Sequence, residues 1–317
     1  MYAEFVKTVL ITGARGFIGR HLAKRLGGQG IRVLGLGHGG WTEDEHRQFG
    51  IAKWGNGDVT RQNLSVLSAG TGGIDSIIHL AGGSSVGPSL SAPEEDFRRT
   101  VLSTIELLEW IRTASPATSM VFASSAAVYG TGHAGPICND AAVRPTSPYG
   151  AHKRIAEELC NSHCRSFGLR AAVVRLFSVY GPGLRKQLLW DACARLSRGP
   201  AVLELGGTGN ERRDFLHVSD AAAFLHAAAA DASTECPAFN AGTGVPVSIR
   251  QVAEQLVDAW NSSARVRFTD VARTGDPESL VADIGVKPAE ASPIEWSWQD
   301  GLREYVAWFK RDGRSVA

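Results

Sequence analysis

The sequence predicts an α/β fold in which a doubly wound parallel sheet carries a smaller C-terminal lobe. Three observations predict it. Short apolar runs of strand length recur along the first 180 residues, helix-length patterns separate them, and a glycine-rich turn follows the first run. Runs that are apolar throughout fit strands buried on both faces, and alternation of strands with helices implies crossover connections between parallel strands.

The elements follow in order along the chain. Helical patterns extend from the glycine-rich turn to about Leu26 and over residues 93–113, 149–167 and 186–198, and the later ones cover 218–230, 248–260 and 302–310. Ser248 with Gln251 three residues on forms a capping box that fixes one helix start. We expect residues 1–180 to form the sheet domain and 181–317 mainly the lobe, and whether the lobe returns elements to the sheet stays open. The expected strands are residues 8–12, 32–36, 75–80, 119–124 and 170–177.

Composition excludes several classes of protein. With 317 residues, 44% hydrophobic and 21% charged residues and a net charge of +1, the chain has no electrostatic reason to bind nucleic acid or an anionic membrane. The five cysteines lack the paired spacing of a metal site, so we expect buried thiols, a reducing compartment and no metal. No apolar run reaches the length of a signal segment or a membrane span, which predicts a cytoplasmic location.

The glycine-rich turn predicts a dinucleotide site of the Rossmann type. Gly13 makes the tight turn, Gly16 admits a pyrophosphate, and Gly19 lets the helix pack on the strand. The helix N-terminus then presents unpaired N–H groups to the phosphates. Arg15, Phe17 and Ile18 belong to the same cofactor-binding turn.

The second strand leaves the choice of cofactor open. NAD-binding folds commonly place a carboxylate after it, to bind the ribose, but here Gly37, His38 and Gly39 follow and Glu43 is the first acid. Arg15 in the turn would suit a 2′-phosphate, which favours NADP(H). The alternative is NAD(H), with His38 or backbone N–H groups on the ribose and Arg15 on the adenine. Asp58 is a candidate for the adenine amino group or a solvated turn residue.

Tyr149 and Lys153 form a Y-x-x-x-K pair at a predicted helix start. At this spacing both side chains lie on one helix face, and an ammonium near a phenol lowers its pKa. Such a tyrosine suits proton transfer to or from a sugar hydroxyl. Ser124 and Ser125, at the end of a predicted strand, complete the set.

Together these residues resemble the extended short-chain dehydrogenase/reductases, and within them the nucleotide-sugar epimerase/dehydratase group. The resemblance covers nearly the whole chain. It rests on T-G-A-R-G-F-I-G at 12–19, I-I-H-L-A-G at 77–82, F-A-S-S-A-A-V-Y-G at 122–130, S-P-Y-G-A-H-K at 147–153, V-Y-G-P-G at 179–183, R-D-F-L-H-V-S-D at 213–220 and R-T-G-D at 273–276.

The resemblance implies a role for each matching residue. Ser125 would bind the reacting hydroxyl, Tyr149 would transfer the proton, and Lys153 would bind the nicotinamide ribose and tune the tyrosine. Arg213 and Arg273 would clamp the diphosphate of a nucleotide-diphosphate sugar, with Asp276 at the nucleotide, although Arg213 in a surface salt bridge with Asp214 or Asp220 is an alternative. The further residues implied are Val59, Leu80, Ala81 and Gly82 at the cofactor and Ser84 and Ser178 at the substrate.

Departures from the family pattern narrow the reaction. Ala126 and Ala127 stand where 4,6-dehydratases carry an Asp-Glu acid and base, so dehydration is disfavoured. Ser84, Thr100 and Ser178 stand where epimerases of the UDP-glucose type commonly have Lys, Asn and Asn. The expected reaction is then hydride transfer at a hexose carbon, which we expect to be C4. Two kinds of enzyme carry it out, a 4-ketoreductase and a 4-epimerase, and the preference for NADP(H) inferred from Arg15 favours the reductase.

A redox sensor that binds a dinucleotide without catalysis is a remote alternative, because such proteins lose the Tyr or the Lys. The resemblance also implies a homodimer through helices at 93–113 and 149–167. The apolar residues offered for that contact are Leu102, Ile105, Leu108, Ile155 and Leu159.

Overall fold

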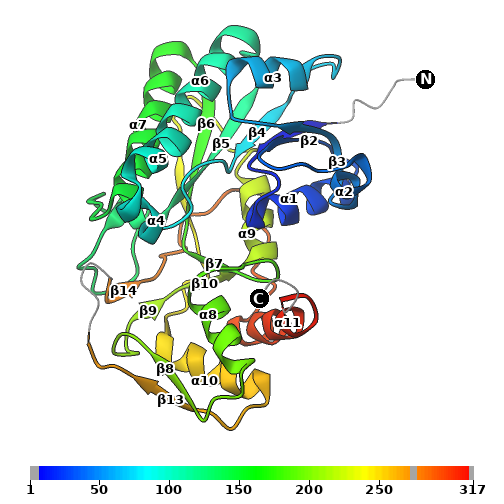
Figure 1. The fold of residues 1–317 in the computed structure, drawn as a ribbon. Helices are drawn as coiled ribbons and strands as arrows, with labels where there is room; N and C mark the ends of the chain where they lie inside the picture. Colours follow the sequence, from blue (N-terminus) through cyan, green and yellow to red (C-terminus); the bar gives the residue numbers. More distant parts are fainter. Residues whose placement is uncertain (1–6, 272–276, 314–317) are drawn as a thin grey trace.

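The computed structural model describes residues 7–271 and 277–313. A seven-stranded sheet flanked by helices forms the larger part of the molecule (Figure 1). The strand order is β11-β6-β5-β4-β1-β2-β3, and every neighbouring pair is parallel. The order reverses beside β1, the switch point at which such sheets bind ligands. The strands are β1 (Thr8–Thr12), β2 (Arg32–Gly37), β3 (Ile51–Asn56), β4 (Ser76–His79), β5 (Ser119–Ser125), β6 (Arg170–Leu176) and β11 (Ala238–Ala241).

Helices cover both faces of this sheet. Side chains alternate along β1, so Val9 and Ile11 pack on α1 (Phe17–Gly28) and α9 (Val218–Ala227). Leu10 faces the opposite layer, which consists of α3 (Arg61–Ser68), α6 (Ser103–Ala114) and α7 (Pro148–Phe167). The short helix α2 (Glu43–Gln48) lies beside the edge strand β3. The two apolar cores explain why the central strands read as unbroken apolar runs.

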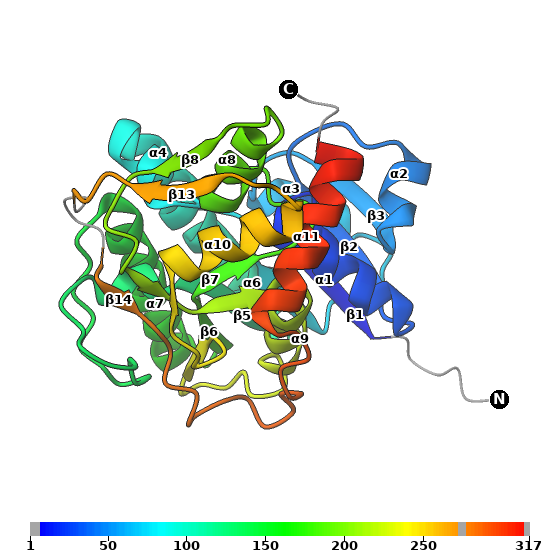
Figure 2. The same cartoon turned by 90° about the horizontal axis from the view of Figure 1, so that it is seen from below.

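The C-terminal lobe lies beyond the carboxyl edge of the sheet (Figures 1 and 2). Its core joins α8 (Gln187–Leu196), α10 (Ile249–Trp260) and α11 (Trp298–Asp312). The capping box at Ser248 and Gln251 is confirmed as the start of α10. The lobe's strands are β7 (Ser178–Tyr180) with β10 (Phe215–His217), β8 (Val202–Leu205) with β13 (Arg265–Phe268), and β9 (Arg212–Arg213) with β12 (Val247–Ser248) and β14 (Ser279–Leu280).

The five apolar runs are confirmed as strands, but two sheet strands escaped the sequence analysis. The edge strand β3 carries exposed and half-buried residues, and β11 has only four residues, so neither forms a long apolar run. Because β11 and α9 come from the second half of the chain, that half contributes to the sheet layers. A division of the chain near residue 180 stays a prediction.

The helix expected over 93–113 is confirmed as a continuous helical run from Pro93 to Ala114, with a π-helical turn inside it that the sequence did not predict. The run comprises α5 (Pro93–Phe97), a π-helical turn (Arg98–Leu102) and α6 (Ser103–Ala114), after the separate helix α4 (Val86–Ser91). The wider π turn brings Thr100 to the loop after β4, where its Oγ1 accepts a hydrogen bond from the Gly83 N–H at 2.8 Å. The π-helical turn therefore helps to hold the loop after β4, which lines the site described below.

Other expectations concern cysteines, metals and membranes. Four of the five thiols are buried and Cys138 is exposed. Among residues 7–271 and 277–313, no cluster of three or more metal-ligating side chains occurs. Within those same residues, no helix combines the length and apolar character needed to cross a bilayer.

Candidate active site

One open cavity of about 1920 Å³ collects the predicted site residues. It follows the carboxyl ends of the strands and continues beneath the C-terminal lobe. Arg273 and Asp276 lie outside the described residues. All other residues predicted for cofactor or substrate line this cavity: Gly13, Arg15, Gly16, Phe17, Ile18, Gly19, His38, Asp58, Val59, Leu80, Ala81, Gly82, Ser84, Ser125, Tyr149, Lys153, Ser178 and Arg213.

The glycine-rich turn has the close contacts that its composition predicts. Gly13 has φ +70° and donates its N–H to the Leu36 carbonyl at 2.7 Å, and a Cβ there would lie 2.9 Å from the Ala81 nitrogen. A Cβ on Gly19 would lie 2.7 Å from the Ala14 Cα. Gly16, the N-cap of α1, makes no side-chain cap, and the first residues of α1 line the cavity, so the unpaired N–H groups of this helix start are available to a pyrophosphate. The described residues therefore fit a dinucleotide.

In the region after β2, Arg15 does not have the position expected for binding the 2′-phosphate of NADP(H). The Arg15 guanidinium lies 5.6 Å from the Trp41 ring centroid and runs along Gly39, where a Cβ would collide with it. His38 Nε2 lies 2.9 Å from Asp58 Oδ1, and both side chains are exposed. The two residues predicted to contact the adenosine thus meet each other at the end of the cavity, and Arg15 packs on an aromatic ring.

Ser125, Tyr149 and Lys153 meet where β5 ends and α7 begins. Ser147 caps α7 by accepting a hydrogen bond from the Gly150 N–H at 3.2 Å, and Pro148 occupies the first turn. A Cβ on Gly150 would lie 2.5 Å from the Ala127 carbonyl oxygen, so glycine lets the helix approach the segment after β5. This approach lets Ser125 hydrogen-bond the Tyr149 side chain.

The electrostatics of the trio correct one expectation. Burial raises the pKa of Tyr149, a hydrogen bond with Ser125 opposes that rise, and the Asp96 charge adds to it. Lys153 Nζ donates to the Ala123 carbonyl at 2.8 Å and lies 5.9 Å from the centroid of the Tyr149 ring. The predicted lowering of the tyrosine pKa by the ammonium is therefore wrong for this structure, because desolvation outweighs a cation placed over the ring.

The pKa of Lys153 is also shifted from its ordinary value. Burial lowers its pKa to about 8, and the nearby carboxylates of Asp96 and Glu157 oppose the change. Gly82 lies close to the ammonium, since a Cβ there would be 3.4 Å from Nζ. The lysine thus connects the helix with the loop after β4.

Sequence reasoning missed a second buried pair beside the trio. His152 Nδ1 lies 2.6 Å from Asp96 Oδ2, with the side chains 13% and 6% exposed. The Asp96 carboxylate also packs against the backbone of Gly83. The position of His152 next to Lys153 was the available signal, but its partner lies in a different helix.

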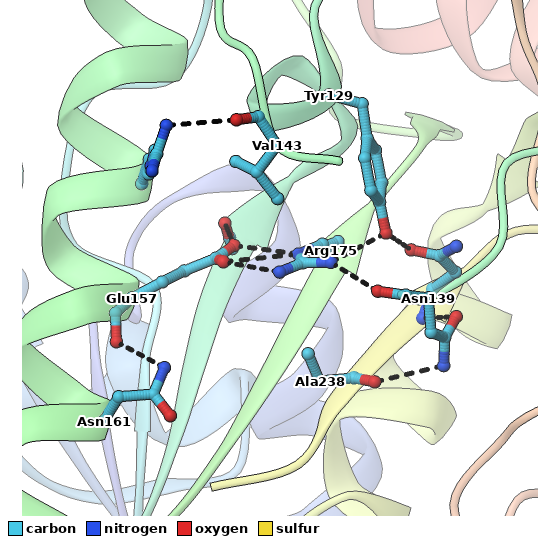
Figure 3. A network of polar contacts seen from close by, with 10 residues as sticks. Tyr129, Asn139, Val143, Glu157, Asn161, Arg175 and Ala238 are labelled. Carbon is cyan, nitrogen blue, oxygen red and sulfur yellow. Dashed lines mark hydrogen bonds and ion pairs between the residues drawn. The ribbon is translucent and has the colours of Figure 1, made fainter. Parts of the chain in front are cut away.

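A buried polar network is centred on Arg175 and Glu157 (Figure 3). Arg175 on β6 donates to Glu157 Oε2 at 2.8 Å and to the Tyr129 hydroxyl at 2.8 Å. Ser124, the residue before Ser125, donates to Glu157 Oε1 at 2.5 Å. Since Glu157 follows Lys153 by one helical turn, the network ties the end of β5 to the catalytic face of α7.

The substrate side of the cavity is built from the loop after β4 and from the lobe. Arg213 on β9 donates to the carbonyls of Arg212 and Pro277 at 2.8 and 2.7 Å. The carboxylates offered as its alternative partners, Asp214 and Asp220, each accept backbone N–H groups from other segments.

Ser178 begins β7, and its N–H donates to the Asp214 carbonyl at 2.9 Å. Ser84 accepts a hydrogen bond at its carbonyl from Lys186 Nζ at 3.0 Å. Lys186 is a cavity residue that the sequence analysis did not identify.

A family model described as the NAD dependent epimerase/dehydratase family matches residues 9–242. The chain belongs to this family. The enzyme is therefore of the extended short-chain dehydrogenase/reductase type, as the motifs predict.

Individual members of the epimerase/dehydratase family resemble it over most of its length. UDP-glucuronate 4-epimerase 2 of Arabidopsis thaliana is 27% identical, over 98% of this chain and 78% of the relative. UDP-glucose 4-epimerase of Streptomyces lividans is 31% identical, over 87% and 88%. The structure of MoeE5 in complex with UDP-glucose and NAD superposes with a TM-score of 0.85 at 30% identity, over 96% of this chain and 99% of the other.

These relatives bear on two expectations. The named enzymes are 4-epimerases, and MoeE5 carries NAD. The preference for a 4-ketoreductase and for NADP(H) has no support from them, and the epimerase alternative is favoured.

Proposed function

We propose that the protein is a UDP-sugar 4-epimerase that retains NAD between turnovers. The observation that carries the proposal is the convergence of Ser125, Tyr149 and Lys153 on one cavity that the glycine-rich turn also lines. Relatives named UDP-sugar 4-epimerases that match nearly the whole chain support it.

In this proposal the described side chains move one proton on and off the sugar. Tyr149 takes the proton from the C4 hydroxyl as the C4–H bond breaks, and later returns it to the same oxygen. Ser125 holds that oxygen, and Lys153, which lines the same cavity, would bind the nicotinamide ribose of the cofactor. Bound NAD supplies the hydride acceptor for oxidation and the hydride donor for reduction. Between the two steps the ketone turns within the cavity, so reduction occurs on the opposite face.

The segment after Ser125 supports epimerisation over dehydration. Ala126 is buried with 1% exposure, and Ala127 donates its N–H to the Ser125 hydroxyl at 3.2 Å. Methyl groups in these positions supply no acid or base for removing water. Tyr149 is then the proton-transferring group of the proposed reaction.

We also propose a homodimer through α7 and the segment before α6. Leu102 and Ile155 are 45% and 40% exposed, although Leu108 from the same predicted stripe is fully buried against the sheet. The contact is therefore narrower than the five-residue stripe expected from the sequence. Light scattering on Leu102→Glu/Ile155→Glu should give a monomer where the parent gives a dimer, and a monomeric parent would contradict this.

Two measurements on the purified protein test the proposed reaction. Denaturation followed by mass spectrometry should release close to one NAD per chain, and ¹H NMR should show a UDP-hexose converting to its C4 epimer without added cofactor. An empty protein that binds NADPH ahead of NADH and reduces only 4-keto sugars would overturn the proposal.

A further inference from the structure

Lys186 presents a half-buried ammonium to the substrate side of the cavity. It lies between β7 and α8, and its Nζ donates to the Ser84 carbonyl at 3.0 Å. Burial lowers the pKa of Lys186, with no opposing charge from a carboxylate. A partly buried ammonium that contacts one neutral carbonyl carries a desolvation cost that an anion would offset.

The acidic residues of the cavity do not neutralise it. In the described part of the chain, each carboxylate of the cavity wall is bound by a group other than Lys186. The pairs are Asp58 with His38, Glu95 with Arg99, Glu106 with Arg61, and Glu211 with the N–H groups of Thr208 and Gly209. The positive charge of Lys186 is thus left for a ligand.

The ammonium contacts the loop after β4, which also reaches Lys153. Ser84 follows Gly82 by two residues, and Gly82 packs against Lys153 Nζ. Arg213, the residue that the family resemblance assigns to the diphosphate, lies on β9, where it is anchored to the Pro277 carbonyl. Lys186 is therefore placed for a group on the sugar rather than for the nucleotide.

We propose that Lys186 recognises a carboxylate on the sugar, so that the preferred substrate is a UDP-hexuronate. This inference rests on the proposed function and specifies its substrate class. A hexose with a neutral hydroxymethyl group leaves the half-buried ammonium without an anion, whereas a carboxylate in the same position forms a charge-assisted hydrogen bond. The difference favours the uronate by discriminating against the neutral sugar.

Calorimetry on the NAD-loaded enzyme tests this with UDP, UDP-glucose and UDP-glucuronate. The wild type should bind UDP-glucuronate more tightly than UDP-glucose by about tenfold to a hundredfold, the range expected for hydrogen bonds to charged groups. Lys186→Gln should remove this preference and change the affinities for UDP and UDP-glucose less than about threefold. Lys186→Arg should keep part of it because the charge remains.

Lys53→Gln is the matched control. Lys53 Nζ also donates to backbone carbonyls, those of Val66 and Leu67 at 3.1 and 2.9 Å, but it lies outside the cavity wall. This variant should keep the wild-type preference.

Two outcomes would overturn the assignment. If Lys186→Gln lowers the affinities for UDP, UDP-glucose and UDP-glucuronate equally, the lysine binds the diphosphate. If the variant keeps the wild-type preference for UDP-glucuronate, the lysine only contacts Ser84. Failure of the proposed function is distinguishable, because binding selectivity is measured without turnover. Selective binding of the uronate by an enzyme that does not epimerise it would uphold Lys186 and reject epimerisation.

Discussion

His152 and Asp96 form a buried pair beside the catalytic helix face, with 2.6 Å between Nδ1 and Oδ2. Burial raises the pKa of Tyr149 and lowers that of Lys153 to about 8, and the Asp96 charge raises both. One carboxylate that contacts no predicted substrate group therefore influences the ionisation of both members of the Y-x-x-x-K pair.

Asp96→Asn should move the pH profile of kcat/KM to lower pH. The groups facing the reacting pair are Ser125 from β5, Glu157 from α7, and Asp96 from α5. Because the Asp96 charge raises the pKa of Tyr149 and the pKa of Lys153, its removal lowers both, and any limb of the profile that either group sets moves to lower pH.

The control for this profile is Glu94→Gln, which removes an exposed acid from the same helix α5. Its pH profile should match the wild type. If the pH profile of Asp96→Asn stays in place or moves to higher pH, the pair of His152 and Asp96 only supports the fold.

Tyr149→Phe should abolish turnover and leave NAD affinity within a few-fold of the wild type. Loss of a general acid–base group costs about 10²–10⁴-fold in rate, whereas the glycine-rich turn and Lys153 remain intact. Steady-state kinetics and the NAD content per chain measure the two effects. Turnover near that of the wild type would reject the mechanism.

The sequence predicted the parts of the site that depend on local spacing. Gly13 and Gly19 belong to one turn, and Tyr149 and Lys153 lie one helical turn apart, so their geometry follows from the backbone. The pairing of His152 with Asp96, 56 residues apart, depends on how separate helices pack, and periodicity carries no such information.

Lys186 and Ser84 show the same limit at 102 residues of separation. The tyrosine pKa was mispredicted for a related reason. Spacing shows which charges are near, but it does not show that Lys153 would donate to the Ala123 carbonyl in a desolvated position. Burial and direction are properties of the packed structure.

Arg175→Met should destabilise the protein by about 3–5 kcal/mol, because it leaves the buried Glu157 carboxylate without its ionic partner. The two side chains are 9% and 7% exposed and lie at the centre of the network in Figure 3. Urea unfolding measures the loss. The double variant Glu157→Leu/Arg175→Met should cost less than the sum of the single variants, since it buries no unpaired charge.

Arg267→Met provides the comparison for that measurement. It removes an arginine from an ion pair with Glu204 in which both side chains are more than half exposed. Such a pair contributes about 0–1 kcal/mol, so the variant should unfold almost as the wild type does. Equal losses in Arg175→Met and Arg267→Met would show that the buried network does not support the site.

Gly13→Ala should lower both stability and NAD retention. The methyl group would lie 2.9 Å from the Ala81 nitrogen, and φ of +70° adds strain of about 1–3 kcal/mol for a residue with a side chain. Gly28→Ala is the control, because a Cβ at this last residue of α1 meets nothing within 4 Å. Melting temperature and NAD released per chain separate the two effects. If Gly13→Ala melts lower but still releases one NAD per chain, the turn is needed for packing β1 against the loop after β4 and not for holding the dinucleotide.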